Sequence, residues 1–304
     1  MKRKHTAIAG IVVLFCLTQQ RSARAEQPAN EAKAAESAEA SKAAKLDTSD
    51  MVLIPAGTFN MGYDGPNAPA ASKPVHKVAL RAYYMDKFEV TKEKYCKFLN
   101  EIGKVKIDKG FLYDEKGQML CRPDALKQEG GKWVPLKGME RHPVVSVTWY
   151  GADAYAKHFG KRLPTEAEWE RAARAGSTTG WYFGDDPKLL DDFAWHSGNS
   201  ELKTHEVGLK KPNAFGIFDM YGNAYEVVSD WYAEDYYVRS PAENPHGPEH
   251  GEYHVRRGGS YYYAALAGCN SWQRVSTNIG NEPEATFVDS NWGFRTVADA
   301  PAEK

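Results

Sequence analysis

Apolar and polar residues alternate where the ordered part of the chain begins. In residues 51–61 large apolar side chains recur at every second position around a Pro-Ala-Gly turn, and residues 83–90 continue this pattern. A period of two is typical of half-buried strands. We therefore expect a small antiparallel sheet built from these two segments.

Three later segments repeat apolar residues every three or four positions, which is the spacing of one face of a helix. The first follows Thr91 and ends at Gly103, and the second spans residues 148–159. The third follows Thr165, where Glu168 completes a capping box. We expect the first two helices to pack on the sheet.

Irregular segments fill much of the remaining chain. Residues 104–140 are rich in glycine and charge, and we expect an exposed insertion between the first two helices. Beyond Gly176 the chain is dense in Gly, Asn, Asp, Pro and aromatic residues and has few regular periods. Long irregular stretches in a compact domain need something to hold them.

The N-terminal residues have the pattern of an export signal. Residues 1–25 combine a basic start, an apolar run of about eleven residues and a small-x-small cleavage site, so we expect a cleaved signal peptide. Bilayer spans need roughly twenty apolar residues, and no stretch reaches that length. Residues 26–50, rich in Ala, Glu and Lys, predict a flexible linker, followed by a domain over 51–298 and a tail over 299–304. The predicted location is periplasmic or secreted.

Net charge argues against one class of partner. The 39 basic and 40 acidic residues nearly cancel, leaving a net charge of −1. Nucleic-acid binding needs a clustered basic face, so nucleic acid is not an expected partner.

Cysteine usage leaves two readings open. Beyond the predicted signal peptide the chain has Cys96, Cys121 and Cys269, an odd number for an oxidising compartment. A disulfide between Cys96 and Cys121 is the favoured pairing. The alternative is three buried, unpaired thiols that serve as small core residues.

Five motifs occur in a fixed order along residues 50–298. They are Met51–Gly62, Arg162–Glu170, the Gly-Asn-Ala-Tyr-Glu run at 222–226, the Arg-Gly-Gly-Ser-Tyr run at 257–261 and the Asn-Trp-Gly-Phe-Arg run at 291–295. In this order they resemble the formylglycine-generating enzyme, or sulfatase-modifying factor, superfamily. The resemblance implies an α+β, elaborated C-type-lectin-like fold with little regular secondary structure, whose loops are tied by calcium.

One calcium site is implied around residues 219–226. The resemblance implies that calcium binds through Asp219, Gly222, Ala224 and Glu226, with glycine and alanine contributing backbone oxygens. Carboxylate and carbonyl oxygens are the ligands that calcium prefers. The alternative is an ordinary turn with solvated acids. A second, weaker calcium site is expected at Asp192 and Phe193.

The chain departs from the family at the copper site. In formylglycine-generating enzymes the Arg-Gly-Gly-Ser motif leads to two cysteines, five residues apart, that bind copper(I). Here Tyr263 takes the first position, and Cys269 lies within one residue of the second. A single thiolate cannot form a two-coordinate copper(I) site, so copper is not expected and formylglycine generation is not the predicted reaction. Cys269 remains a candidate catalytic thiol.

Iron cannot be assigned from this sequence. Superfamily members that resemble ergothioneine-type sulfoxide synthases hold iron through histidines of an added helical domain, which this chain lacks. The only histidine cluster is His246, His250 and His254. It lies in a Gly/Pro/Glu loop, where four-residue spacing does not align side chains, so a solvated loop is expected there.

A third branch, the exported pyoverdine-maturation proteins, resembles this chain in size, predicted signal peptide and missing cysteine pair. Aromatic and basic residues near the expected pocket could bind an aromatic or peptide ligand. Those candidate substrate-binding residues are Tyr261, Tyr263, Trp272, Arg274 and Trp292. The alternative is that they are core residues.

Glutamates of the third predicted helix receive no chemical role. Glu166, Glu168 and Glu170 lie beside Arg162 and Arg171, where we expect charges that pair and cap the helix end.

Two functions therefore remain open. One is oxidative modification or maturation of a peptide or small aromatic metabolite by an exported protein, without copper-dithiolate chemistry. The other is a non-enzymatic, calcium-stabilised, lectin-like binding or scaffold protein for a peptide, glycan or protein in the periplasm or at the cell surface.

Overall fold

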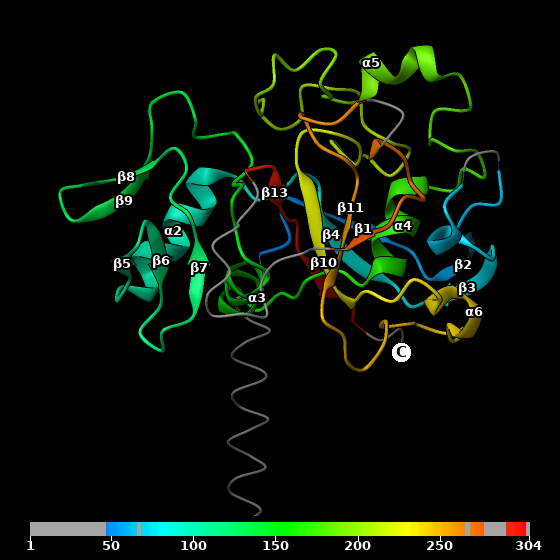
Figure 1. Cartoon of the computed structure of the whole chain (residues 1–304), viewed down its shortest axis with the longest axis horizontal. Helices are drawn as coiled ribbons and strands as arrows, with labels where there is room; N and C mark the ends of the chain where they lie inside the picture. Colours follow the sequence, from blue (N-terminus) through cyan, green and yellow to red (C-terminus); the bar gives the residue numbers. More distant parts are fainter. Residues whose placement is uncertain (1–46, 66–67, 265–267, 277–289, 302–304) are drawn as a thin grey trace, which may run out of the picture. The chain divides into compact units, whose positions relative to one another are not determined.

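The ends of the domain meet in one small sheet. In the computed structural model, which describes residues 47–65, 68–264, 268–276 and 290–301, strand β4 (Tyr83–Asp86) lies between β1 (Met51–Ile54) and β14 (Val297–Asp299), and both pairings are antiparallel (Figure 1). The sheet expected from residues 51–54 and 83–86 is confirmed. Because β14 runs to Asp299, the predicted boundary after residue 298 falls inside a strand.

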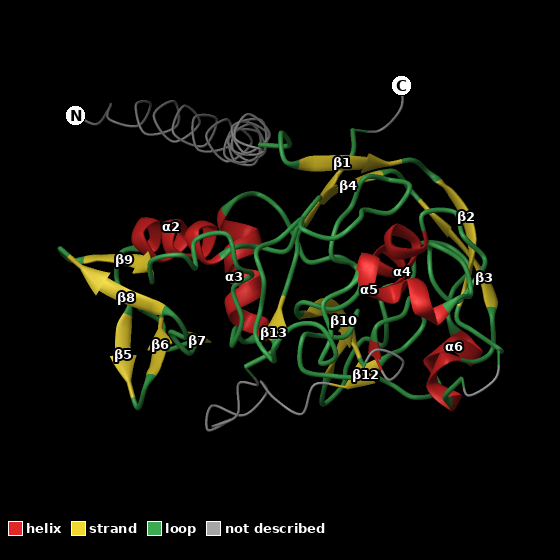
Figure 2. Ribbon diagram, turned by 90° about the horizontal axis from the view of Figure 1, so that it is seen from above, coloured by secondary structure: helices red, strands yellow, loops and turns green. Residues whose placement is uncertain are grey.

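Residues 57–61 do not join that sheet, which corrects the prediction. Strand β2 (Gly57–Met61) pairs with β3 (His76–Leu80) in a separate two-stranded ribbon (Figure 2). The chain turns at Pro55–Gly57, and a Cβ atom at Gly57 would lie 2.9 Å from Nη2 of Arg171. The glycine therefore leaves room for a guanidinium group beside the turn.

A second sheet carries the C-terminal motifs. Its order is β12-β11-β10-β13, in which β10 is antiparallel to β11 and parallel to β13. These strands are β10 (Tyr225–Trp231), β11 (His254–Arg257), β12 (Val275–Ser276) and β13 (Trp292–Gly293). Glu226 is the partner of both Arg257 and Gly293, so three of the sequence motifs meet at one point of this sheet.

The three predicted helices are confirmed, together with their capping residues. They are α2 (Lys92–Ile102), α3 (Trp149–His158) and α4 (Glu166–Arg174). Thr165 and Glu168 form the capping box of α4, and Gly103 ends α2 with φ 75°. The short helices are η1 (Ala70–Ser72), η2 (Pro187–Leu189), α5 (Leu190–Phe193) and α6 (Tyr236–Arg239).

The expected insertion at 104–140 is more than an exposed loop. It contains a three-stranded sheet, β5 (Lys106–Asp108), β6 (Phe111–Tyr113) and β7 (Met119–Cys121), and a ribbon of β8 (Leu126–Glu129) and β9 (Lys132–Pro135). Its apolar residues Leu112, Leu120 and Trp133 are buried in a cluster with Tyr95 and Phe98 of α2. Hydrophobic burial anchors this region, whereas its charged residues face outward.

A second hydrophobic cluster surrounds α4. Trp169 and Ala172 of this helix pack with Tyr83 and Met85 of β4 and with Val255 of β11. As expected, few regular elements occur between residues 176 and 224. None of the helices in the described part of the chain has the length and apolar character needed to cross a bilayer. The predicted signal peptide and most of the predicted linker lie outside the described residues.

Candidate functional site

Helix α4 turns two of its glutamates into the protein. Glu166 and Glu170 are 1% and 0% exposed and are paired as expected, but the expectation that their partners are the neighbouring Arg162 and Arg171 is wrong for both. That expectation is right for Glu168, which pairs with Arg162 at 2.7 Å. The helix presents residues four apart on the same face, which the local sequence encodes, but the depth of burial depends on the elements packed around it.

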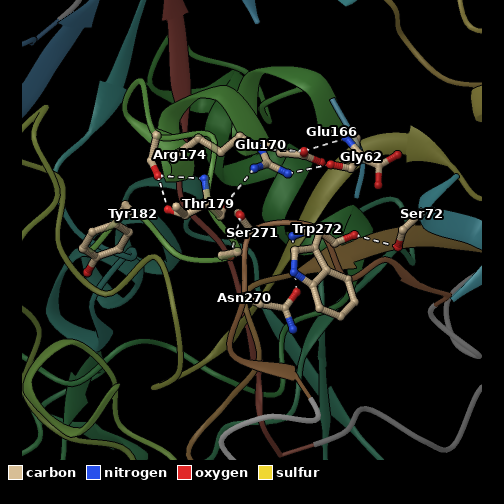
Figure 3. Close-up of polar contacts among 12 residues, drawn as sticks. Gly62, Ser72, Glu166, Glu170, Arg174, Thr179, Tyr182, Asn270, Ser271 and Trp272 are labelled. Carbon is tan, nitrogen blue, oxygen red and sulfur yellow. Dashed lines mark hydrogen bonds and ion pairs between the residues drawn. The ribbon is translucent and has the colours of Figure 1, made fainter. Parts of the chain in front are cut away.

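Two guanidinium groups from distant segments and one from α4 itself hold these glutamates, in what we call the arginine network. Figure 3 shows Arg174 with the two glutamates. Arg257 contacts Glu166 at 3.1 Å and Glu170 at 2.6 Å. Arg274 contacts Glu166 and Arg174 contacts Glu170, at 2.7 and 2.8 Å. Burial opposes ionisation, but Arg174 and Arg257 hold the pKa of Glu170 below its ordinary value.

A second buried group, which we call the carboxylate cluster, consists of Glu89, Asp219 and Glu226 with Arg295. Arg295 donates to both oxygens of Glu226, the shortest contact being 2.6 Å. Glu89 accepts the backbone N–H of Ala224 at 3.1 Å. Burial and the nearby carboxylates of Asp219 and Glu226 raise the pKa of Glu89, and burial raises that of Asp219 to about 6.

Asp219 and Glu226, the two predicted calcium ligands that belong to this cluster, differ in how far their carboxylate oxygens are already hydrogen-bonded. Asp219 is buried, and its Oδ1 has no hydrogen-bond partner among the described residues, whereas Oδ2 accepts the N–H of Gly208 at 2.6 Å. An unpartnered buried carboxylate oxygen fits a cation. Glu226 fits less well, because Arg295 and the indole N–H of Trp169, at 2.8 Å, already bond to it.

The turn between these acids is tightly constrained. A Cβ atom at Gly222, where φ is 76°, would lie 2.1 Å from the carbonyl oxygen of Trp195. Glycine is therefore required there for both its conformation and its close backbone approach. Within the described ranges no three His, Cys, Asp or Glu residues are arranged to hold a metal ion, so calcium here would depend on backbone oxygens such as those of Gly222 and Ala224.

The weaker calcium prediction falls on short helix α5. Asp192 forms a salt bridge with Lys211 at 2.8 Å, and both side chains are more than half exposed. The ring of Phe193 stacks on Phe183 with centroids 4.4 Å apart. The charge of Asp192 is therefore balanced at the surface by Lys211 and does not require a metal ion.

Cysteine chemistry differs from the favoured prediction. Cys96, Cys121 and Cys269 are all free and buried, so the predicted Cys96–Cys121 disulfide is wrong and the alternative of three buried thiols is confirmed. Cys269 is 0% exposed, and burial raises the pKa of its thiol to about 12. The thiolate is the nucleophilic form of cysteine, so this environment disfavours a catalytic role.

Three predicted substrate-binding residues lie near one another. Tyr263 contacts the ring of Tyr225 with centroids 5.4 Å apart, and the guanidinium of Arg256 lies over the rings of Tyr225 and Trp292 at 4.7 and 4.5 Å. Tyr261, in the same segment as Tyr263, is buried. We call Tyr225, Arg256, Tyr263 and Trp292 the aromatic cluster. No role for Arg256 was predicted.

The other two predicted residues lie with the arginine network. Trp272 stacks on Tyr63 with centroids 4.9 Å apart, and its carbonyl oxygen accepts a hydrogen bond from Ser72 (Figure 3). Arg274 pairs with Glu166 and lies 4.2 Å from the ring centroid of Tyr237. The predicted pocket is therefore divided, and the Arg274 charge is already paired.

Sequence reasoning missed Glu89 and assigned no role to Arg295. Glu89 lies between Phe88 and Val90, just before the cap of α2, and an acid inside an apolar run is the signal that could have identified it. Arg295 ends the Gly-Phe-Arg motif and is fully buried, which is rare for a charged residue without a partner.

Two cavities are lined in part by residues of α4. One, of about 600 Å³, is lined by residues that include Arg81, Glu168 and Asp299. The other, of about 460 Å³, is lined by residues that include Lys77 and Arg171. No residue of the aromatic cluster lines either cavity.

Comparison with known proteins shows which family this chain belongs to. Residues 36–300 match the FGE-sulfatase family, described as the sulfatase-modifying factor enzyme 1-like domain. The formylglycine-generating enzyme of Streptomyces coelicolor is 35% identical over 289 residues, covering 83% of this chain and 90% of that enzyme.

Two solved structures share the fold. PvdO from Pseudomonas aeruginosa superposes with a TM-score of 0.64 at 27% identity, covering 82% of this chain and 94% of that one. Treponema denticola variable protein 1 has a TM-score of 0.63 at 26% identity, covering 82% and 95%. The α+β, elaborated C-type-lectin-like architecture is confirmed, and the chain belongs to the sulfatase-modifying factor enzyme 1-like family.

Proposed function

We propose that this chain is an exported binding member of its family, which recognises a peptide, protein or glycan without copper-dithiolate chemistry. One observation carries the proposal. Cys269, the thiol nearest the family's copper position, is buried with its pKa raised to about 12, and Tyr263 stands where the other thiol is expected. A protonated, enclosed thiol supplies neither a nucleophile nor a soft metal ligand.

The aromatic cluster supports a binding role. Tyr262, beside it in sequence, is 58% exposed, and its ring meets that of Tyr263 edge-on with centroids 5.9 Å apart. Exposed tyrosines next to an arginine are common in recognition surfaces, because they offer large rigid rings with polar ends. The surface at Tyr262 and Tyr263 could therefore contact a ligand.

Calcium has a structural role in this proposal. Asp219 would hold the ion with backbone oxygens of Gly222 and Ala224, and Glu89 would add negative charge nearby. Bound calcium would offset the repulsion that raises the pKa of Glu89. The same turn leads into β10 and the aromatic cluster, so the ion would stabilise the binding surface.

Oxidative maturation of a peptide or small aromatic metabolite is the second candidate function. It is favoured by the likeness to PvdO and by the organisation that this chain shares with exported pyoverdine-maturation proteins. The aromatic cluster suits an aromatic ligand in this case also. The two functions differ in whether Cys269 ever becomes reactive.

Native-state alkylation separates the two functions. At pH 8, without reductant, a pKa of about 12 instead of 9.0 makes the Cys269 thiolate roughly a thousandfold scarcer, so iodoacetamide should label it far more slowly than in the denatured chain. Peptide mass mapping measures the rate, with the urea-denatured protein as control. Rapid labelling of native Cys269, or stoichiometric copper in elemental analysis, would contradict the binding proposal.

A further inference from the structure

The 460 Å³ cavity is lined by residues of β2, β3 and α4, and both strands of the β2–β3 ribbon contact that helix. Asn60 of β2 and Lys77 of β3 are cross-strand partners, so their side chains line the cavity from the same face of the ribbon. Arg171 and Arg174, near the C-terminal end of α4, line it from the helix. The volume is in the range of small-ligand sites.

Positive charge dominates the lining of this cavity. None of its described lining residues is acidic. The charge of Arg174 is balanced by Glu170, at 2.8 Å. Lys77 and Arg171, by contrast, form no salt bridge within the described part of the chain.

Arg171 is the unusual member of this set, because it is 9% exposed and has no carboxylate partner among the described residues. Its guanidinium donates only to backbone carbonyls, those of Gly57 and, at 2.5 Å, of Pro55. Burial lowers the pKa of Arg171, which means that the buried charge is only partly compensated. An anionic group in the cavity would supply the missing counter-charge.

The remaining lining indicates what the anion is attached to. Asn60 and Thr178 offer amide and hydroxyl groups, which pair with ligand hydroxyls. Tyr63 and Phe215 offer aromatic rings, against which the apolar face of a sugar ring can pack. A polyhydroxylated ring that carries one negative charge would match the polar groups, the aromatic rings and the basic residues of this lining.

We propose that this cavity binds an anionic sugar of the uronic-acid class, with its carboxylate between Arg171 and Lys77. This inference rests on the proposed binding function and adds a site and a ligand class to it. The site is separate from the aromatic cluster and from Cys269, since none of those residues lines the cavity.

Calorimetric titration of the full chain with D-glucuronate and with uncharged D-glucose tests the proposal. We expect glucuronate to bind at least about tenfold more tightly than glucose, the effect of one charge-assisted hydrogen bond. Lys77→Gln should weaken glucuronate binding by about tenfold and leave glucose binding unchanged. Lys132→Gln is the matched control, since Lys132 is also an exposed lysine on a two-stranded ribbon and should change neither.

Arg171→Lys is the second variant, because it keeps the positive charge but loses the planar guanidinium group, which can donate two parallel hydrogen bonds to a carboxylate. It should weaken glucuronate binding while thermal unfolding shows that the variant is folded. Equal affinities for glucuronate and glucose, or unchanged binding by Lys77→Gln, would overturn the proposal. Inorganic sulfate bound as tightly as glucuronate would overturn the sugar assignment.

The proposed function can fail separately from this site. If the chain binds peptides or neutral glycans on an array but no uronic acid, the anionic-sugar site is wrong and the binding function stands. If native Cys269 is alkylated rapidly, the binding function itself is contradicted.

Discussion

The arginine network and the carboxylate cluster are both buried, yet their charges are arranged in opposite ways. In the network, Glu166 and Glu170 are each held by two guanidinium groups. In the cluster, Glu89, Asp219 and Glu226 share the single guanidinium of Arg295. The pKa of Glu170 is lowered, whereas the pKa values of Glu89 and Asp219 are raised.

This difference gives the two groups different roles. The arginine network is a structural framework, whereas the carboxylate cluster is a site that responds to protons and cations. The network connects α4 to β11 and to residues 271–274, and its three guanidinium groups neutralise both of its carboxylates without any added ion. The cluster carries excess negative charge and an unpartnered Asp219 oxygen among the described residues, so its stability should depend on protons and cations. The following predictions test this contrast.

Breaking the network should have the largest effect. Glu170→Gln leaves the buried Arg174 without its carboxylate partner and Arg257 with Glu166 alone, so we expect the free energy of unfolding to fall by about 3–5 kcal/mol. Urea denaturation followed by tryptophan fluorescence measures the change. Glu101→Gln, which removes a carboxylate whose surface contacts are with His158 and Lys97, is the control and should cost no more than about 1 kcal/mol. If Glu170→Gln lowered the free energy of unfolding by no more than the control does, the arginine network would not be a structural framework.

Removing the Asp219 carboxylate should abolish the response to calcium. At a calcium concentration of about 100 Kd the wild-type chain should gain about 2.7 kcal/mol relative to chelator, because only the folded state binds the ion. Asp219→Asn should lose this gain, as measured by thermal unfolding with and without calcium. Asp192→Asn is the matched control at the weaker predicted site, and its response should equal that of wild type. A full calcium response in Asp219→Asn would remove the proposed site.

The Asp219 carboxylate should also have a smaller effect, on the pH dependence of the free energy of unfolding measured in the presence of a calcium chelator. The folded-state pKa of Asp219 is raised to about 6 from 3.8, so between about pH 4 and pH 6 the folded state binds more protons than the unfolded state. Its contribution therefore lowers the free energy of unfolding as pH rises through this window, by about 2 kcal/mol, and is constant above it. Raised pKa values at Glu89 and Asp230 act in the same direction. The difference between wild type and Asp219→Asn isolates Asp219, and parallel pH curves for the two proteins would show that its pKa is not raised.

Predictions from sequence succeeded where the signal was local. Helices α2, α3 and α4 follow from apolar spacing and from caps within four residues, and the pairing of β1 with β4 follows from alternation. Among the predicted site residues, Asp219 and Glu226 lie close enough to interact, whereas Arg274 contacts Glu166 and Trp292 contacts Arg256. Arg274 bonds to Glu166, 108 residues away, and no local pattern encodes such a partner.

The sequence by itself determined the family, the helices and their caps, because these depend on residue identities at short spacing. Only the tertiary structure decided which charges are buried and which partners hold them. In the sequence Glu166 and Glu170 look like helix-end charges, and Arg171 looks like one of their partners. Desolvation and pairing act across distant segments, so the excess charge at Glu89 and the uncompensated charge at Arg171 appear only once the chain is folded.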